Sequence, residues 1–572
     1  MSSNPITPIA RFINLLKVDK QEIASIYVYA LFHGIVSLSL PLGIQAIINL
    51  IGSGQVSTSW ILLVVFVISG VALTGIMQIM QLTISENLQQ KIFTRSAFEF
   101  AYRIPRMKLE AIDKAYLPEL VNRFFDTLSV QKGLSKILMD FSSASLQVIF
   151  GLILLSMYHP FFILFSFLLV VIAYLIFRFT SPQGLKTSIK ESKYKYEVAS
   201  WLEEVARAME TFKLAGNSPL PMEKTDTVVE GYLNSRKAHF KTLLVQYVNL
   251  VAFKVVIVAG LLLIGGMLVI NQQMNIGQFV ASEIIIILII GSIEKLILSM
   301  ETIYDVLTSL EKIGNVTDIP LDRDNGSKIN LEGEEGLSVQ LTDFSYRFIG
   351  RPNDFLKKIN INAQAGDKIC LSGFNGSGKS LLLQMLAGLY DEFGGSLTYN
   401  GMPLGNWCRE DIHEVIGDNL MKEEIFKGSL LENITLGKPN ITIKEVQGLV
   451  EIVGLKSFVG SLSEGYNEEL IPEGKNLPKS VRLRIILARC LAGSPKVILL
   501  ESSFNQLHDI DKKRFMDYLL ASNATVVAIS NDPTIAQQFD RTIVLKDGEI
   551  IAENEFSVIK SQVWFHEVFQ NR

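Results

Sequence analysis

Six apolar stretches, each long enough to cross a lipid bilayer, occupy the first half of the chain. A helix needs about 20 residues to cross the hydrocarbon core. The stretches are Ile23–Leu50, Trp60–Ile84, Ile137–Tyr158, Phe161–Phe179, Val245–Ile270 and Ile276–Met300. Pro41 interrupts the first, and a membrane helix accommodates such a proline with a kink. We therefore predict an all-α domain that spans a membrane six times.

Basic residues are confined to one side of this predicted domain. The three short loops (52–59, 159–160 and 271–275) contain no Lys or Arg, whereas the two long loops (87–136 and 178–241) contain many. Because basic loops stay in the cytosol, both long loops and both chain termini are predicted to be cytosolic.

The two long loops have helical patterns of their own. In Asn87–Arg106 and Lys186–Leu214, apolar residues recur at helical spacing among charged ones, so the membrane helices are expected to continue beyond the bilayer. Each loop has a break at its tip, at 112–120 and 216–221. The tips suit a surface that docks on another domain, and an ordinary helical hairpin without a partner is the alternative.

Three ionisable residues fall inside the predicted spans, where such residues are functional candidates by default. Lys254 and Glu294 both lie roughly 25 to 28 Å from the outer ends of their helices. They are expected to form a structural ion pair, with a transport role as the alternative. Glu283 lies only about 12 Å deep without an evident partner, so it lines a pathway or faces a water-filled cavity.

The second half of the chain has the pattern of an α/β domain. Apolar periodicity fades after Ile313, so we predict a membrane domain over 1–316, a linker over 317–335 and a second domain over 336–572. Val497–Leu500 and Val526–Ile529 are continuous apolar runs bounded by polar residues. Such runs are typical of strands buried in a helix-covered sheet.

A phosphate-binding motif lies between a short apolar strand and an apolar helix. Gly373-Phe374-Asn375-Gly376-Ser377-Gly378-Lys379-Ser380 fits the pattern G-x-x-x-x-G-K-[ST]. Backbone N–H groups of such a loop converge on phosphate oxygens at a positive helix N-terminus. Lys379 would reach the β- and γ-phosphates and the Ser380 hydroxyl would face Mg²⁺. A Gly/Ser-rich turn without a ligand is the alternative. The candidate nucleotide ligands here are Gly373, Asn375, Gly376, Ser377, Gly378, Lys379 and Ser380.

Composition agrees with a membrane protein and excludes one class of partner. The 572 residues are 49% hydrophobic and only 19% charged, with a mean hydropathy of +0.31. The net charge of −4 argues against a nucleic-acid partner. The three cysteines do not have metal-ligand spacing. A reducing cytosol is the compartment that fits them best.

Six spans with two long cytosolic loops, a linker and a P-loop domain resemble an ATP-binding-cassette (ABC) exporter half-transporter. The membrane domain is similar to those of the bacterial type I secretion and bacteriocin exporters. The resemblance implies an ABC-type ATPase domain that uses ATP and Mg²⁺, and a multi-pass location in the bacterial cytoplasmic membrane. It also implies a homodimer or a heterodimer with another half-transporter, a membrane-fusion adaptor partner, and coupling helices near the tips at 113–120 and 217–223.

Several positions that match this family's motifs carry unexpected residues. Tyr346 matches the aromatic residue that stacks on adenine. Met421 stands where the family has a glutamine that senses Mg²⁺ and the attacking water. The family signature Leu-Ser-Gly-Gly-Gln is replaced by Leu477, Pro478, Lys479, Ser480 and Val481. Pro478 lacks both a hydroxyl and an N–H, and Lys479 adds a side chain where glycine allows close approach, although its charge still favours phosphate.

The residues that the family uses for hydrolysis are also replaced. Glu501 keeps a carboxylate for Mg²⁺, whereas Ser502 takes the place of the general base, and a hydroxyl cannot accept a proton from water at neutral pH. Asn531 replaces the histidine that contacts the γ-phosphate. His508 aligns with a loop position and is expected to lie on the surface. No catalytic position of the family is therefore intact.

These substitutions predict a membrane protein of ABC-exporter type that binds ATP and hydrolyses it slowly or not at all. One alternative is an active ATP-driven exporter of polypeptides or small molecules. Another is a non-transporting structural or regulatory subunit of an envelope complex, since fold alone does not choose between these.

Overall fold

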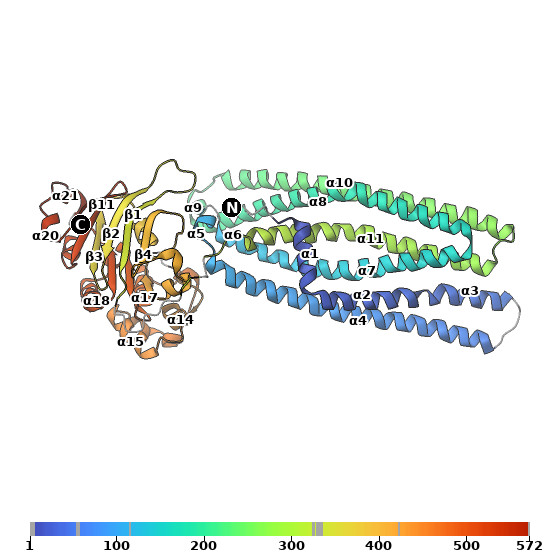
Figure 1. The fold of residues 1–572 in the computed structure, drawn as a ribbon, viewed down its shortest axis with the longest axis horizontal. Helices are drawn as coiled ribbons and strands as arrows, with labels where there is room; N and C mark the ends of the chain where they lie inside the picture. Colours follow the sequence, from blue (N-terminus) through green and yellow to red (C-terminus); the bar gives the residue numbers. More distant parts are fainter. Residues whose placement is uncertain are drawn as a thin grey trace. The chain divides into compact units, whose positions relative to one another are not determined.

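The computed structural model describes residues 6–52, 58–113, 116–322, 326–327, 336–420 and 424–569 (Figure 1). Its contacts divide the chain into two compact units. The first comprises Met1–Pro105 and Lys114–Ile319, and the second comprises Arg106–Asp113 and Pro320–Arg572. Most of the predicted linker lies outside the described residues, so its bounds stay a prediction.

The first unit consists of helices. They are α1 (Pro8–Val18), α2 (Lys20–Ser37), α3 (Ser39–Gly52), α4 (Thr58–Arg103), α6 (Leu117–Asn122), α7 (Asp126–Tyr158), α8 (Pro160–Arg207), α9 (Met209–Leu214), α10 (Leu220–Ile270) and α11 (Ile276–Thr317). Within the described residues, six helical segments are long and apolar enough to cross a membrane, which confirms the predicted number. Because α4, α8 and α10 have 46, 48 and 51 residues, they extend well beyond a bilayer, also as predicted.

The first membrane segment is interrupted between α2 and α3. Pro41 has no N–H to donate to the carbonyl oxygen of Ser37, four residues earlier. The α-helix ends at Ser37 and resumes at Ser39. The predicted interruption is therefore present one turn before the proline itself.

The long helices lie side by side (Figure 1). Some of them approach each other closely at glycines. A Cβ added to Gly133 would lie 2.4 Å from Val306, and one added to Gly184 would lie 2.3 Å from the Tyr304 ring. Both glycines lie in the parts of α7 and α8 that extend beyond the predicted spans, and the missing side chains let these helices approach α11 closely there.

The second unit is built on a six-stranded sheet with the order β12-β11-β3-β10-β9-β6. Its strands are β3 (Lys368–Gly373), β6 (Ile416–Asp418), β9 (Val497–Leu500), β10 (Thr525–Ile529), β11 (Arg541–Lys546) and β12 (Glu549–Asn554). All neighbours are parallel except the β11–β12 hairpin. Every residue of β3, β9 and β10 is buried, which explains the apolar runs at 369–371, 497–500 and 526–529.

Shorter elements surround this sheet. A second, antiparallel sheet contains β1 (Val339–Tyr346), β2 (Leu356–Ala363), β4 (Gly394–Tyr399) and β5 (Met402–Pro403). The helices are α5 (Leu109–Ile112), α12 (Lys379–Leu386), α13 (Arg409–Glu414), α14 (Leu430–Thr435), α15 (Ile443–Ile452), α16 (Lys456–Ser461), α17 (Lys479–Leu491), α18 (Asp509–Ala521), α19 (Pro533–Ala536), α20 (Phe556–Ile559) and α21 (Phe565–Val568). The predicted α/β architecture is confirmed.

Candidate functional site

The P-loop connects the carboxyl end of β3 to α12. Its glycines Gly373, Gly376 and Gly378 have positive φ angles of 145°, 75° and 98°, which favour glycine. A Cβ on Gly373 would lie 2.2 Å from the carbonyl oxygen of Leu545 in β11. The glycine at the start of the loop is therefore required both by its backbone conformation and by its close approach to the neighbouring strand.

The side chain of Lys379 lies across the inside of this loop. Its Nζ donates to the carbonyl oxygens of Gly373 and Phe374 at 2.9 and 2.7 Å. Burial lowers the pKa of Lys379, while the Glu501 carboxylate opposes that shift. Asn375, Gly376 and Ser380 are exposed on the loop. A phosphate that entered here would meet exposed backbone at a helix N-terminus and an amine able to exchange its loop carbonyls for phosphate oxygens.

Tyr346, the predicted adenine contact, has a covered ring. Only 4% of the residue is exposed, and its ring packs edge-on against Phe348 and Tyr390, with centroids 5.3 and 5.4 Å away. An adenine role for Tyr346 stays a prediction. Phe355, which sequence reasoning missed, is 40% exposed and would lie 3.2 Å from a Cβ on Gly378. Its ring lies against the P-loop.

Asn531 follows β10 and is joined directly to the first residue of the P-loop. Its Nδ2 donates to the Gly373 carbonyl oxygen at 3.0 Å, and its Oδ1 accepts from the Gly373 N–H at 3.1 Å. Both polar ends of the amide are therefore used on the backbone of the neighbouring strand. In this arrangement, the side chain at the predicted γ-phosphate contact is held as a cross-link between β10 and β3.

A second amide, Asn419, was not found from the sequence. It lies just beyond β6 and is buried. Its Oδ1 accepts from the backbone N–H of Glu501 at 2.6 Å, and its Nδ2 donates to the Ser503 hydroxyl at 2.9 Å. Ser502, at the predicted general-base position, is exposed. The turn after β9 is thus fixed by an asparagine. The strand before Asn419 is only Ile416-Gly417-Asp418, which is too short and too polar to have marked this position in the sequence.

The carboxylates beside this edge of the sheet have other partners. Asp532 accepts hydrogen bonds from the N–H and hydroxyl of Thr534. Asp418 accepts from the Leu420 N–H, and its burial raises its pKa. Amides and hydroxyls do not take protons from water near pH 7. Among the described carboxylates around the loop, we therefore retain Glu501 as the candidate metal ligand.

The residues that replace the family signature lie at the start of α17. Pro478 is the N-cap of this helix and provides no side-chain hydrogen bond to it. Lys479 and Ser480 are exposed, Leu477 is half-buried and Val481 is buried. His508 is exposed at the N-cap of α18, as predicted for a surface histidine. Met421 lies outside the described residues.

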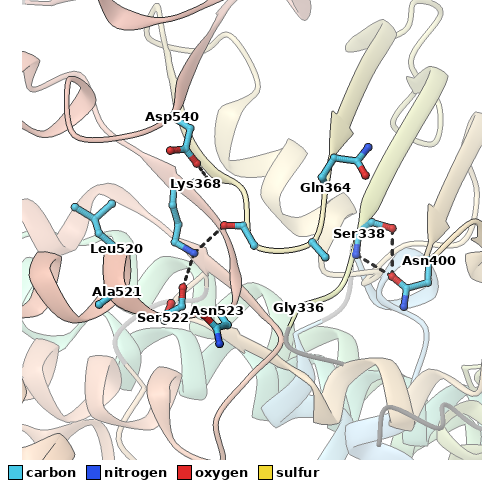
Figure 2. Close-up of a pocket in the computed structure, with 12 residues that line it drawn as sticks. Gly336, Ser338, Gln364, Lys368, Asn400, Leu520, Ala521, Ser522, Asn523 and Asp540 are labelled. Carbon is cyan, nitrogen blue, oxygen red and sulfur yellow. Dashed lines mark hydrogen bonds between the residues drawn. The ribbon is translucent and has the colours of Figure 1, made fainter. Parts of the chain in front are cut away.

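A hollow of about 890 Å³ in the second unit lies at the amino end of β3, the end opposite to the P-loop (Figure 2). Lys368, the first residue of β3, extends into its wall. Its Nζ donates to the carbonyl oxygens of Gly366, Ser522 and Ala524 at 2.9, 2.8 and 2.5 Å. Because this ammonium already has three acceptors, it serves to hold the strand ends together.

The segment Arg106–Asp113 is bound to the second unit by charged groups. Arg106 pairs with Glu410, and Lys108 pairs with Asp391. Asp391 also pairs with the buried Arg409, and its N–H donates to the Glu110 carboxylate. The first predicted loop tip therefore overlaps a segment that has polar partners in the P-loop unit.

The predicted ion pair inside the membrane helices is present. Lys254 Nζ of α10 lies 2.6 Å from Glu294 Oε2 of α11, and both side chains are 30% exposed. Glu283 is half-buried in α11 and makes no ion pair with the residues that the structure describes. It stays a candidate for a pathway-lining residue.

Comparison with known proteins relates the two units to one family. The model of the ABC transporter transmembrane region matches residues 23–293, and the ABC transporter model matches residues 356–505. The solved structure of a bacterial Atm1-family ABC exporter with ATP bound superposes with a TM-score of 0.82 at 16% identity, covering 95% of this chain and 96% of its own. At that identity the superposition shows the fold alone.

Curated relatives are bacterial export proteins. The transport/processing ATP-binding protein ComA of Streptococcus pneumoniae is 24% identical over 78% of this chain. The alpha-hemolysin translocation ATP-binding protein HlyB of Escherichia coli O157:H7 is 26% identical over 62% of this chain. The matches cover 62% and 50% of those two proteins, so the chain spans about half to three fifths of their length.

Proposed function

Since the chain belongs to the ABC exporters as a half-transporter with one ATP-binding domain, we propose that this domain binds ATP with Mg²⁺ and hydrolyses it very slowly or not at all. The observation that carries the proposal is the pair of hydrogen bonds between Asn531 and Gly373. These bonds use both polar atoms of the Asn531 side chain, which stands at the predicted γ-phosphate contact. In the turn after β9, Ser502 stands at the predicted position of the general base.

Nucleotide binding is supported by the open side of the P-loop. The loop has the backbone conformation that its glycines require, and Asn375, Gly376 and Ser380 are exposed to an incoming phosphate. Ser380 and Glu501 would hold Mg²⁺, since hydroxyl and carboxylate oxygens suit this hard cation. Phe355 offers an exposed ring beside the loop.

Slow hydrolysis follows from the groups that face the phosphate side. A positioned general base contributes about 10² to 10⁴ in rate, and Ser502 cannot supply it. Asn531 and Asn419 are both committed to backbone or hydroxyl partners. Precise positioning of the γ-phosphate adds a further factor that these side chains do not provide.

In a dimer of the family type, each nucleotide site would combine the P-loop of one subunit with the signature of the other. This chain replaces both the base and the signature, so a homodimer would have two impaired sites, and a heterodimer with an intact half-transporter would also have two. The proposed location is the bacterial cytoplasmic membrane, with both termini cytosolic. A membrane-fusion adaptor is the proposed further partner.

Two other functions remain distinguishable by experiment. An active exporter of polypeptides or small molecules fits the names of the curated relatives, which include a hemolysin translocation protein. A non-transporting structural or regulatory subunit fits a domain that binds ATP without turnover. The first requires rapid ATP hydrolysis, whereas the second requires a stable complex with other envelope proteins.

The test measures ATP binding and ATP turnover on the same purified full-length protein in nanodiscs. We expect saturable Mg-ATP binding that Lys379→Ala weakens at least tenfold, with phosphate release close to background in both proteins. Lys560→Ala changes an exposed lysine outside the P-loop and serves as the matched control. Turnover of several ATP per second that Lys379→Ala abolishes would disprove the proposal. Co-purification with envelope proteins other than an ABC subunit would favour the regulatory alternative.

A further inference from the structure

A polar cavity of about 400 Å³ lies among the membrane helices of the first unit. It is lined from α2, α3, α4, α7 and α11, and all of its described lining residues belong to that unit. Its polar side chains include His33, Gln78, Gln147, Ser292 and Lys295. Ionisable residues in membrane helices are functional candidates by default, so a cluster of polar side chains with a lysine around an open volume is a candidate ligand site.

Lys295 gives this cavity a positive charge. No acidic side chain is among the described residues that line it. The neighbouring carboxylate, Glu294, is already paired with Lys254. Lys295 itself forms no ion pair with any residue in the part of the chain that the structure describes. The site is therefore a cation without a counterion, and an anion is the ligand that would neutralise it.

His33 adds a hydrogen-bond donor without an acceptor. The imidazole is 7% exposed, and the Gln78 amide nitrogen lies 3.0 Å from its Nε2. With Gln78 as the donor, neutral His33 carries its hydrogen on Nδ1, and this buried atom has no partner. An unpaired buried donor costs about 1–3 kcal/mol. A ligand oxygen beside the ring would remove this cost.

The polar and apolar parts of the cavity lie at different depths. Counted along the helices from the ends that carry the short loops, Lys295 of α11 and Gln78 of α4 lie about 30 Å deep. Ile287 of α11 and Val71 of α4 lie only about 15–20 Å deep. The hydrocarbon core is about 30 Å thick. The charged end thus coincides with the inner headgroup level, and the apolar end lies within the inner half of the bilayer.

We infer that this cavity binds one anionic phospholipid of the inner leaflet, with its phosphate beside Lys295 and its glycerol and first acyl carbons against Val71 and Ile287. The inference rests on the proposed membrane orientation and not on the state of the ATP site. The volume suits a headgroup rather than a polypeptide segment. Ile287 and Val71 are 60% and 52% exposed, so an acyl chain can continue outward over apolar surface.

Gly291 allows the cavity to be filled without disturbing the helices. A Cβ at this lining position would meet no atom within 4 Å, and the same holds for Gly266 of α10, which does not line the cavity. Gly291→Leu therefore blocks the site, and Gly266→Leu is its matched control. Lys295→Gln removes the charge, and Lys241→Gln removes an exposed lysine elsewhere as its control.

The experiment is native mass spectrometry of the purified full chain titrated with phosphatidylglycerol or phosphatidylcholine. We expect one tightly retained phosphatidylglycerol, with apparent affinity lowered at least fivefold by Lys295→Gln and by Gly291→Leu and unchanged in the controls. Equal retention of the two lipids, or equal retention by all variants, would overturn the inference. Displacement by millimolar glycerol 3-phosphate would also overturn it, since the site would then recognise a free anion. ATPase assays on the same samples report separately on the proposed function.

Discussion

Asn531 and Gly373 exchange two hydrogen bonds of 3.0 and 3.1 Å, which join the end of β10 to the start of the P-loop. A side chain that both donates to and accepts from one backbone residue is held in place by that residue. The relationship ties the first residue of the P-loop to the segment that follows β10.

Removing this cross-link should loosen the P-loop. Asn531→Ala loses two hydrogen bonds, each worth about 1 kcal/mol, so we expect the second unit to lose about 1–2 kcal/mol of stability. Urea unfolding of the full chain measures this loss, and Asn440→Ala, which changes an exposed asparagine, is the control. A variant as stable as the control would show that the cross-link contributes little.

Restoring the missing groups should restore turnover only when they are combined. Ser502→Glu supplies a carboxylate, Asn531→His frees Gly373 from the amide, and Pro478→Ser with Lys479→Gly returns a hydroxyl and close backbone approach. We expect each single change to alter ATPase rate less than threefold, and all four together to raise it at least tenfold. A single substitution that restores full activity would contradict this account, because the defect would then lie in one group.

The ion pair between α10 and α11 should show strong coupling. Lys254→Met leaves Glu294 without its partner, and we expect a loss of about 1–3 kcal/mol, moderated because both side chains are 30% exposed. The exchanged pair Lys254→Glu with Glu294→Lys should recover most of it. Thermal unfolding in a single detergent compares the wild type, Lys254→Met, each single exchange and the exchanged pair. A loss in the exchanged pair equal to the sum of the two single losses would argue against direct pairing.

His413 should make the second unit sensitive to acid. Burial, helped by Arg409, lowers the pKa of His413 from 6.5 to about 4. Between these values the unfolded chain binds a proton that the folded chain does not. The contribution of neutral His413 to the free energy of unfolding is therefore complete above pH 6.5. It is lost as the pH falls towards 4, by up to about 3 kcal/mol. Urea midpoints at pH 7.5 and 5 should differ less in His413→Asn, and an unchanged difference would assign the acid sensitivity to other groups.

Much of the architecture could be predicted because its signals are local. Membrane spans, the P-loop and the buried strands follow from runs of apolar residues and from one spacing of glycines. The covered ring of Tyr346 could not be predicted, since it depends on Tyr390 and Phe348 meeting across the fold. The roles of Asn419 and Asn531 were equally hidden, because their partners lie far away in the sequence, just after β9 and at the end of β3.

The pairing of Lys108 with Asp391 also has a consequence in time. The two residues are 283 positions apart in the chain. At a synthesis rate of about 5–20 residues per second, Lys108 is made on the order of 15–60 s before its partner. During that interval Glu410 and Asp391, the partners of the segment 106–113, have not yet been made. The segment must therefore stay accessible until the second half of the chain has been made. A chain cut at the linker would separate this segment from the rest of the second unit.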